Sequence, residues 1–281
     1  MSNNGTFGNL QSYRNYTQPT VKRLFGDISS KKNNKSKHGE NIKQLLLSLA
    51  FNGFLTTWEI AKLNYSDTSS IRTREKQIRR LLIGRKDRGK KSPGVLDVGL
   101  IVSKKTKVHQ NISNSYGLSL HGILYCLDVL DFSKKDVDQM AHCYSKSLPM
   151  VFGRWDYLKS ILGDDVYRIK ILASGLLLDN IHITGISQIP IFELVTYLNV
   201  KYRDNYESIT ETALSDQISY WFYTALLIPS TLNKQKDNPE LGKWKKIFEN
   251  DRKLKKWYFD FIKDAYEFYS DRFNVIKTLE P

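Results

Sequence analysis

The first clear apolar periodicity lies between Glu40 and Gly53, in ENIKQLLLSLAFNG. Apolar residues recur there three and four positions apart, the spacing that places side chains on one face of an α-helix. These residues are Ile42, Leu45, Leu46, Leu49 and Ala50. The run ends at Gly53, a residue type that favours the C-terminal end of a helix. The pattern predicts a helix over residues 40–53.

A second, shorter helix is predicted to begin directly after the first. Thr56 is followed three positions later by Glu59, the spacing of a capping box, in which each side chain binds the backbone N–H of the other residue. Ile60, Ala61 and Leu63 then supply a short apolar face. Two helices are therefore expected before residue 65.

The polar stretch YSDTSS, 65–70, predicts a turn in which Ser69 or Ser70 caps a third helix. A helical wheel at about 100° per residue separates two faces of that helix. The apolar side holds Ile71, Ile78, Leu81 and Leu82. The opposite side holds Arg72, Lys76, Arg79 and Arg80. Glu75 is the only acidic residue among them, whereas a solvated helix usually alternates charge signs.

Four further stretches follow the third helix. They are the basic stretch GRKDRGKKSPG at 84–94, GVLDVGLIVS at 94–103, the polar tip HQNISN at 109–114 and SYGLSLHGILYCLDVL at 115–130.

The order of these elements and two short motifs resemble the winged helix-turn-helix family. The triplet Gly99, Leu100 and Ile101 resembles the entry to the first wing strand. The pattern Tyr-x-Leu-Ser/Thr-x-x-Gly at the exit of the second strand is matched by Tyr116, Leu118, Ser119 and Gly122. The resemblance covers residues 40–131 and implies three helices and a β-wing. It places the first wing strand within 94–103, and the second wing strand and a further helix within 115–130. It also implies that Ser119 caps the next helix and that Gly122 lets this helix start close to the strand. The insertion at 84–94 is longer than the tight connection usual in the family, and we expect it to form an extra basic loop.

The second part of the chain, residues 132–281, predicts an all-helical domain, so the expected fold class is mainly α with a winged helix before it. Helical patterns are broken at Gly163, Gly185, Pro190 and Pro229. The last long helix is predicted to carry an aromatic-rich stripe of Trp244, Ile247, Phe248, Leu254, Trp257, Phe261, Ile262, Ala265, Phe268 and Tyr269. Ordinary core, a cofactor-binding face and a partner surface all remain open for this stripe. A homodimer through this domain is one expectation, and this part resembles no family.

The positive charge is concentrated in the first half of the chain. Residues 1–149 contain 25 Arg and Lys against 11 Asp and Glu, whereas residues 150–281 contain 18 of each class. Between Arg72 and Lys107 there are 13 basic and 3 acidic residues. A polyanion is the expected partner, with nucleic acid as the first candidate and an anionic membrane surface as the second. Residues 1–39 have no apolar periodicity and predict a flexible basic tail.

The resemblance implies a set of DNA-binding residues. The third helix would present Arg72, Thr73, Lys76, Gln77, Arg79 and Arg80 to the major groove. The wing would place Lys104, Lys105 and Lys107 at the minor groove or the phosphates. The insertion would add phosphate contacts from Arg85, Lys86, Arg88, Lys90 and Lys91.

Catalytic and metal-binding patterns are not found in the sequence. Cys126 and Cys143 have no CxxC spacing, so we expect neither a disulfide framework nor a zinc site. This cysteine usage fits a protein of the reducing cytoplasm. Asp164 and Asp165 are adjacent, and adjacent side chains point in different directions. The longest uncharged run, 217–233, contains a proline and is shorter than the ~20 apolar residues of a membrane span. We expect no enzyme activity, no cofactor, no metal and no membrane segment.

Charge and resemblance together predict a prokaryotic, cytoplasmic protein that binds specific double-stranded DNA and regulates transcription. One alternative is a plasmid or viral protein of DNA replication, mobilisation or cleavage. Another is a winged helix used only for protein docking, because fold does not fix function. Incubation of the protein with DNA and a divalent metal distinguishes the first two hypotheses, since a regulator leaves the strands intact. Salt-dependent DNA binding separates both from the third.

Overall fold

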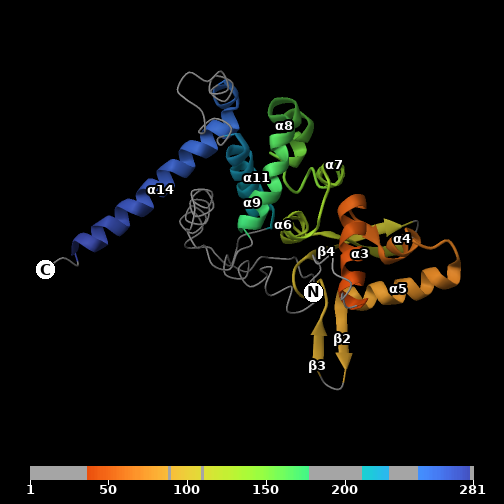
Figure 1. Ribbon diagram of the computed structural model, residues 1–281. Helices are drawn as coiled ribbons and strands as arrows, with labels where there is room; N and C mark the ends of the chain where they lie inside the picture. Colours follow the sequence, from red (N-terminus) through yellow and green to blue (C-terminus); the bar gives the residue numbers. More distant parts are fainter. Residues whose placement is uncertain (1–36, 88–89, 109–110, 177–210, 228–245, 279–281) are drawn as a thin grey trace.

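The computed structural model describes residues 37–87, 90–108, 111–176, 211–227 and 246–278 (Figure 1). These residues are mainly helical and include one three-stranded and one two-stranded antiparallel sheet. This confirms the mainly α class. A contiguous cluster of buried apolar side chains extends from Ile42 to Phe261, through the sheet region and the helices that follow it. The predicted division at residue 131 falls in the short turn between two helices of this arrangement.

The predicted tail overlaps the first helix. Residues 1–36 lie outside the described part of the chain, and α3 (Lys37–Asn52) already begins at residue 37. All five apolar residues predicted for this helix are buried, because they share one face at helical spacing. Gly53 follows the helix with φ 70°, a left-handed conformation that glycine adopts without steric cost.

The second predicted helix is α4 (Thr57–Lys62), preceded by the two-residue strand β1 (Leu55–Thr56). The predicted capping box is present. The Glu59 amide donates to the Thr56 hydroxyl oxygen at 3.2 Å, and the Thr56 amide donates to the Glu59 carboxylate at 2.7 Å. Ile60 and Ala61 are buried, but Leu63 is 47% exposed and does not belong to the apolar face.

The third helix, α5 (Thr68–Ile83), starts earlier than predicted. Its N-cap is Asp67, whose carboxylate accepts the Ser70 amide at 2.8 Å, so the prediction of Ser69 or Ser70 as cap was wrong. Hydrogen bonds from the backbone and side chain of Ser70 lower the pKa of Asp67. Asp67 and the two serines are all good capping types, and the tertiary path of the turn decides between them.

Residues 84–94 form a β-hairpin, which corrects the prediction of a basic loop. Its strands are β2 (Gly84–Asp87) and β3 (Lys90–Pro93), with Gly84 opposite Pro93. Gly84 has φ 83° and reverses the chain at the end of α5. The Val95 and Leu96 amides then donate to the Leu81 and Leu82 carbonyls at 3.0 and 3.1 Å. Both ends of the hairpin are thereby fixed to the last turn of α5.

The predicted strand at 94–103 begins late. Residues 95–100 form turns that bury Val95, Val98 and Leu100, and β4 (Ile101–Val108) starts only afterwards. β4 pairs with β5 (Asn111–Leu118) from Ile101 opposite Leu118 outward, and β1 pairs with the other edge of β5. The sheet order is β1-β5-β4.

The helix after the sheet is α6 (Leu120–Val129), and both residue roles implied for its start are present. The Ser119 hydroxyl accepts the Gly122 amide at 2.9 Å. A Cβ on Gly122 would lie 1.9 Å from the Leu100 carbonyl oxygen, so only glycine allows this close approach. Tyr144, just after α7 (Lys134–Cys143), accepts the Leu118 amide and donates to the Leu49 carbonyl, each at 2.9 Å.

The remaining described elements are short helices and two longer ones. They comprise η1 (Phe152–Arg154), α8 (Trp155–Leu162), η2 (Gly163–Arg168), α9 (Ile169–Leu176), α11 (Glu211–Leu227) and α14 (Arg252–Thr278). Asp138 on α7 accepts Trp155 Nε1 and Lys159 Nζ at 2.7 Å and the Tyr167 hydroxyl at 3.0 Å. Burial acts to raise the pKa of Asp138, but these three donors outweigh it and lower that pKa. This carboxylate fixes α8 and η2 to α7.

The predicted aromatic stripe is core at its beginning. Leu254, Trp257 and Phe261 are buried. The Trp257 ring stacks on Tyr220 of α11 with 5.6 Å between the ring centres, and its Nε1 donates to the side-chain oxygen Oε1 of Gln217 at 2.8 Å. Trp244 lies outside the described residues. A short helix at 246–250 ends at Asp251, which caps α14 by accepting the Leu254 amide at 3.0 Å. The expected single long helix is therefore interrupted.

Candidate nucleic-acid interface

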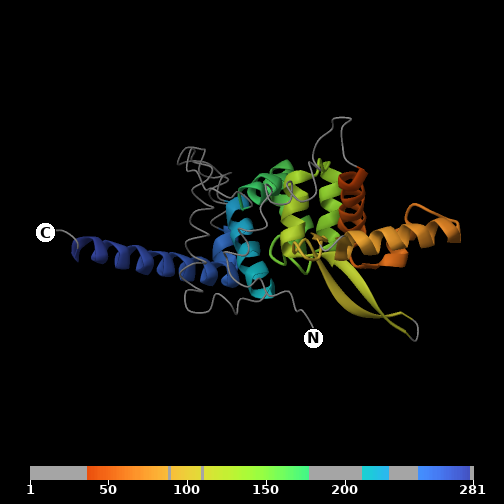
Figure 2. The same ribbon diagram turned by 90° about the horizontal axis from the view of Figure 1, so that it is seen from below.

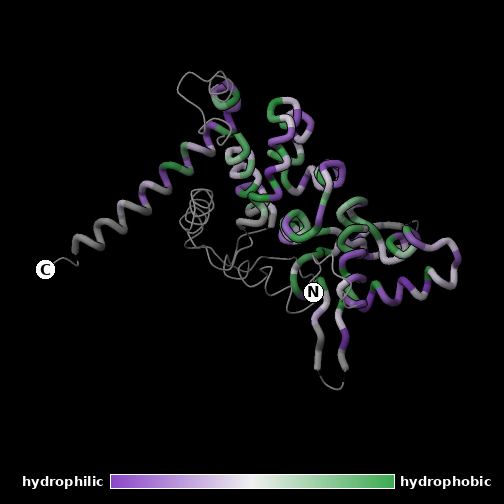
Figure 3. Tube along the Cα trace, viewed as in Figure 1, coloured by the Kyte–Doolittle hydropathy of each residue, from purple (hydrophilic) through white to green (hydrophobic). Residues whose placement is uncertain are grey.

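Helix α5 has one buried and one exposed face. Ile71, Ile78, Leu81 and Leu82 are buried, as the wheel predicts. The six residues predicted to contact the groove are all exposed: Arg72, Thr73, Lys76, Gln77, Arg79 and Arg80. In Figure 1, α5 lies beneath α3 and α4 with its long axis across the end of α3. Figure 3 shows that hydrophilic positions dominate the trace of α5, whereas α3 contains both hydrophilic and hydrophobic positions.

Arg74 is a basic residue of α5 that does not belong to this exposed face. It is buried, and its guanidinium donates to Asn41 at 2.7 Å, Gln44 at 3.2 Å and Gln77 at 3.1 Å. Asn41 and Gln44 lie on α3, so Arg74 joins the two helices. It also holds the Gln77 amide oxygen, which orients that side chain. The alternation of charged and apolar residues alone did not distinguish Arg74 from its exposed neighbours.

Glu75 lies beside the basic face and is partly buried. Its carboxylate accepts the Thr57 hydroxyl at 2.9 Å and the Arg79 guanidinium at 2.7 Å. Burial acts to raise the pKa of Glu75, but hydrogen bonds from Arg79 and Thr57 and the charge of Arg79 outweigh it and lower that pKa. The Arg79 side chain remains 63% exposed. Glu75 therefore orients Arg79 and neutralises one charge of the face.

The basic residues of the insertion lie on the hairpin. Arg85 is exposed, Lys86 follows it on β2, and Lys90 and Lys91 lie on β3. Arg88 lies outside the described residues. In Figure 1 the hairpin projects beyond α5, away from α3 and α4. The insertion thus extends from the same helix that carries the basic face.

Two of the three lysines predicted for the wing, Lys104 and Lys105, lie on opposite faces of the β4–β5 ribbon. Lys104 and Lys105 are neighbours in β4, and alternate residues of a strand point to opposite faces. Lys104 Nζ lies 4.0 Å from the centre of the Phe54 ring, a cation–π contact that holds the ammonium group near the body of the protein. Lys107 lies two positions beyond Lys105 and therefore on the same face of the strand as Lys105.

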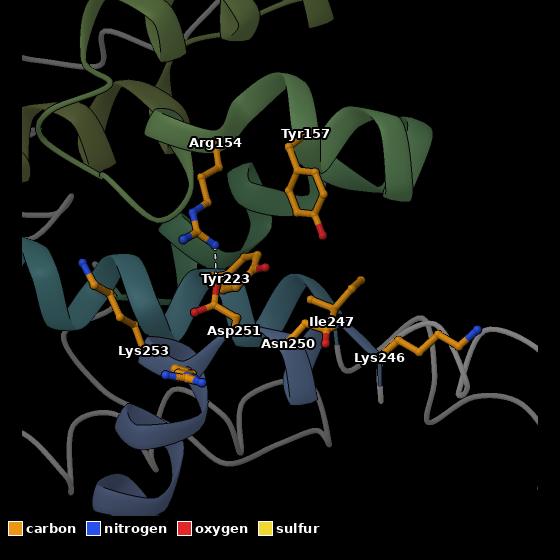
Figure 4. Close-up of a pocket in the computed structure, with 9 residues that line it drawn as sticks. Arg154, Tyr157, Tyr223, Lys246, Ile247, Asn250, Asp251 and Lys253 are labelled. Atoms are coloured by element: carbon orange, nitrogen blue, oxygen red, sulfur yellow. Dashed lines mark hydrogen bonds and ion pairs between the residues drawn. The ribbon is translucent and has the colours of Figure 1, made fainter.

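Two shallow depressions lie elsewhere on the described surface. One, of about 510 Å³, is bounded by α3, the end of α4 and Arg74. The other, of about 530 Å³, lies where α8, α11 and the start of α14 meet (Figure 4). At its centre Arg154 is paired with Asp251 at 2.5 Å and lies over the Tyr223 ring, so its polar groups join the three elements to one another. Among the described residues, no group of His, Cys, Asp or Glu is arranged to hold a metal ion.

The structure thus places the four basic residues predicted for α5, Arg72, Lys76, Arg79 and Arg80, on the exposed face of that helix. No helix in the described ranges is long and apolar enough to cross a lipid bilayer. Neither a family model, nor a curated protein, nor a solved structure matches this chain.

Proposed function

We propose that residues 40–131 form a winged helix that binds double-stranded DNA, with α5 in the major groove. The order helix, strand, helix, helix and two-stranded ribbon, with the short strand β1 on the far edge of β5, supports this assignment. So do the Ser119 cap and the close approach of Gly122 to Leu100, which the family pattern implies. The hairpin at 84–93 is an addition to that pattern.

One observation carries the proposal: a buried apolar face and an exposed basic face lie on opposite sides of α5. The helix has 16 residues and is therefore about 24 Å long at 1.5 Å per residue. The cross-section of an α-helix fits into the major groove, which is about 12 Å wide. Arg72, Lys76 and Arg80 follow one another at four-residue spacing along the exposed face. They therefore form a row of positive charge parallel to the helix axis.

Gln77 and Thr73 lie beside this row and give it the means to distinguish bases. A glutamine amide makes paired hydrogen bonds with adenine, and a threonine contacts thymine methyl groups. Arg and Lys contribute both phosphate contacts and hydrogen bonds to guanine. We propose that this combination serves sequence-specific binding in transcription regulation.

The test compares sequence-dependent and sequence-independent loss of binding. Sites are first selected from a random duplex pool with the full chain. Lys76→Ala is expected to weaken selected sites about tenfold or more and to reduce their advantage over random DNA, because a base contact is lost. Lys105→Ala on the wing is expected to weaken both DNA types equally. Lys255→Ala on α14 has the same loss of charge far from α5 and serves as the control.

Two outcomes oppose the proposal. Equal effects of Lys76→Ala and Lys255→Ala would remove α5 from the interface. Strand cleavage by the full chain with DNA and a divalent metal, abolished by no α5 variant, would favour a nuclease of a replication or mobilisation system over a regulator. Intact strands together with binding that weakens steeply as salt rises support the proposal.

A further inference from the structure

We propose that the β2–β3 hairpin is a second DNA-binding ribbon, which contacts the phosphates beside the groove that α5 occupies. This inference rests on the proposed function and deepens it. The winged-helix pattern contains one ribbon, β4–β5. The hairpin would extend the contact with duplex DNA past the C-terminal end of α5.

The pairing register of the hairpin places like charges opposite each other. Lys86 is the partner of Lys91, and directly opposed residues lie on the same face of an antiparallel pair. Like charges in that position destabilise the pairing, and a two-stranded hairpin is itself only marginally stable in water. A phosphate group beside these two positions would turn the repulsion into attraction. The hairpin is therefore expected to be most stable in contact with a polyanion.

The other face of the hairpin is less charged. Asp87 is paired with Lys90, and Arg85 with Ser92. Opposite charges at one of these positions favour the pairing, so this face does not need an external partner. The two faces thus differ, and the one with Lys86 and Lys91 is the face assigned to DNA.

The base of the hairpin is fixed to α5. Gly84 ends the helix, and the Val95 and Leu96 amides bind the Leu81 and Leu82 carbonyls just after the hairpin. A Cβ on Gly94 would lie 2.2 Å from the Leu82 carbonyl oxygen, so this junction is tightly packed. Any duplex bound along α5 therefore meets the hairpin in one position. Figures 1 and 2 show that it projects in a different direction from the β4–β5 ribbon.

The length of the hairpin strands fits a contact with the backbone of duplex DNA. Each strand has four residues, which span about 13 Å at 3.3 Å per residue. This exceeds the ~8.5 Å depth of the major groove. A ribbon that starts at the end of a groove-bound helix therefore extends past the bases to the sugar-phosphate backbone. A flat membrane surface would meet only its tip.

The experiment uses the full chain and two duplexes of random sequence, one of about 12 and one of about 30 base pairs. The variant Lys86→Gln with Lys91→Gln removes the paired charges. Lys255→Gln with Lys256→Gln on α14 removes the same charge elsewhere and is the matched control. On the long duplex, the hairpin variant is expected to reduce the slope of log affinity against log salt by about 1.8, because each phosphate contact contributes about 0.9. The control variant is expected to leave this slope unchanged.

A second variant guards against effects on folding. Deletion of residues 85–92 joins Gly84 to Pro93, its partner in the hairpin, and leaves α5 and β4 intact. It is expected to bind the short duplex as the wild type does and the long duplex with the reduced slope. Amide hydrogen exchange of residues 84–93 is expected to slow when the wild type binds the long duplex.

The outcomes separate this inference from the proposed function. If the wild type binds no duplex, the proposed function fails. If Lys76→Ala weakens binding while both hairpin variants bind the long duplex like the wild type, the function stands and the hairpin inference is overturned. If the hairpin variants lose binding to phosphatidylserine vesicles while their binding to DNA is unchanged, the hairpin inference is also overturned. The hairpin is then assigned to an anionic membrane.

Discussion

At the residue scale, the side chains that join elements are polar groups with several partners. Tyr144 connects the Leu118 amide of β5 to the Leu49 carbonyl of α3 through one hydroxyl. Its burial raises its pKa well above the usual range. The hydroxyl therefore stays protonated and can both donate and accept. Arg74 and Asp138 have similar connecting roles between α5 and α3 and between α7 and α8.

We expect Tyr144→Phe to lower the free energy of unfolding by about 2 kcal/mol, because a buried amide and a buried carbonyl each lose their partner. Urea denaturation of the full chain measures this change. Tyr157→Phe, at a residue that is 45% exposed, is the control and is expected to have little effect. Equal stabilities of the two variants would contradict the role of the Tyr144 hydroxyl.

Glu75 gives a pH-dependent prediction. Its pKa is lowered in the folded state, so its interaction with Arg79 and Thr57 stabilises the fold fully above the ordinary value of 4.5. That contribution is lost as the pH falls through the lower, folded-state pKa. The difference in unfolding free energy between the wild type and Glu75→Gln should therefore be constant near neutral pH and shrink in the acid range. A difference that grows on acidification would show that the Glu75 carboxyl does not have these partners.

At the element scale, α6 is pressed against the turn before β4. The Ser119 hydroxyl accepts the Gly122 amide and donates to the Gly99 carbonyl at 2.5 Å, so one side chain serves the helix and the turn together. This contact fixes the end of β5 relative to the start of β4. The geometry of the proposed wing therefore depends on a junction far from its tip.

Gly122→Ala is expected to lower the free energy of unfolding by about 3 kcal/mol, because its Cβ would overlap the Leu100 carbonyl oxygen and the backbone has to move. Gly153→Ala is the control, since Gly153 is exposed in η1 and its Cβ would lie 3.1 Å from the Ser145 carbonyl oxygen. Thermal denaturation followed by circular dichroism compares the two. A larger loss for Gly153→Ala would contradict the close packing of α6.

At the scale of the whole molecule, α14 extends away from the other described elements (Figures 1 and 2). Its first turns are buried against α11 through Trp257, whereas Phe259, Ile262 and Tyr266 are 57%, 46% and 73% exposed. These three residues are spaced three and four apart and share one side of the helix. The surface available for a partner is therefore this side, and not the side of Trp257 and Phe261.

A homodimer remains a prediction, and the exposed side of α14 is where we expect its interface. Two copies would place two α5 helices on one DNA molecule and lengthen the recognised site. Sedimentation equilibrium of the full chain is expected to show a dimer that Phe259→Ser with Ile262→Ser converts to a monomer. Ile171→Ser, at an apolar position of α9 that is 69% exposed, should leave the dimer unchanged. A wild-type monomer at tens of micromolar would contradict the prediction.

The sequence by itself determined the features that depend on neighbours along the chain. Helical spacing placed Ile78 and Leu82 in the core and Lys76 outside it, and the capping box at Thr56 marked the start of α4. The family resemblance implied the roles of Ser119 and Gly122. The Ser119 cap is local to the start of α6, whereas Gly122 approaches the Leu100 carbonyl, which is distant along the chain. The exposed residues of the candidate interface on α5 follow from the same periodicity.

Tertiary structure decided the features that depend on distant partners. Residues 84–94 contain glycine, proline and charge, which favour a loop locally, but the fixed ends at α5 and Leu96 bring the two halves into register as a hairpin. Arg74 is buried because Asn41 and Gln44 of α3 receive its guanidinium. The apolar arc of α14 is broader than the surface of α11 that covers it. Periodicity therefore places both Phe261 and Ile262 in the apolar stripe. Only the packing buries Phe261 and leaves Ile262 exposed.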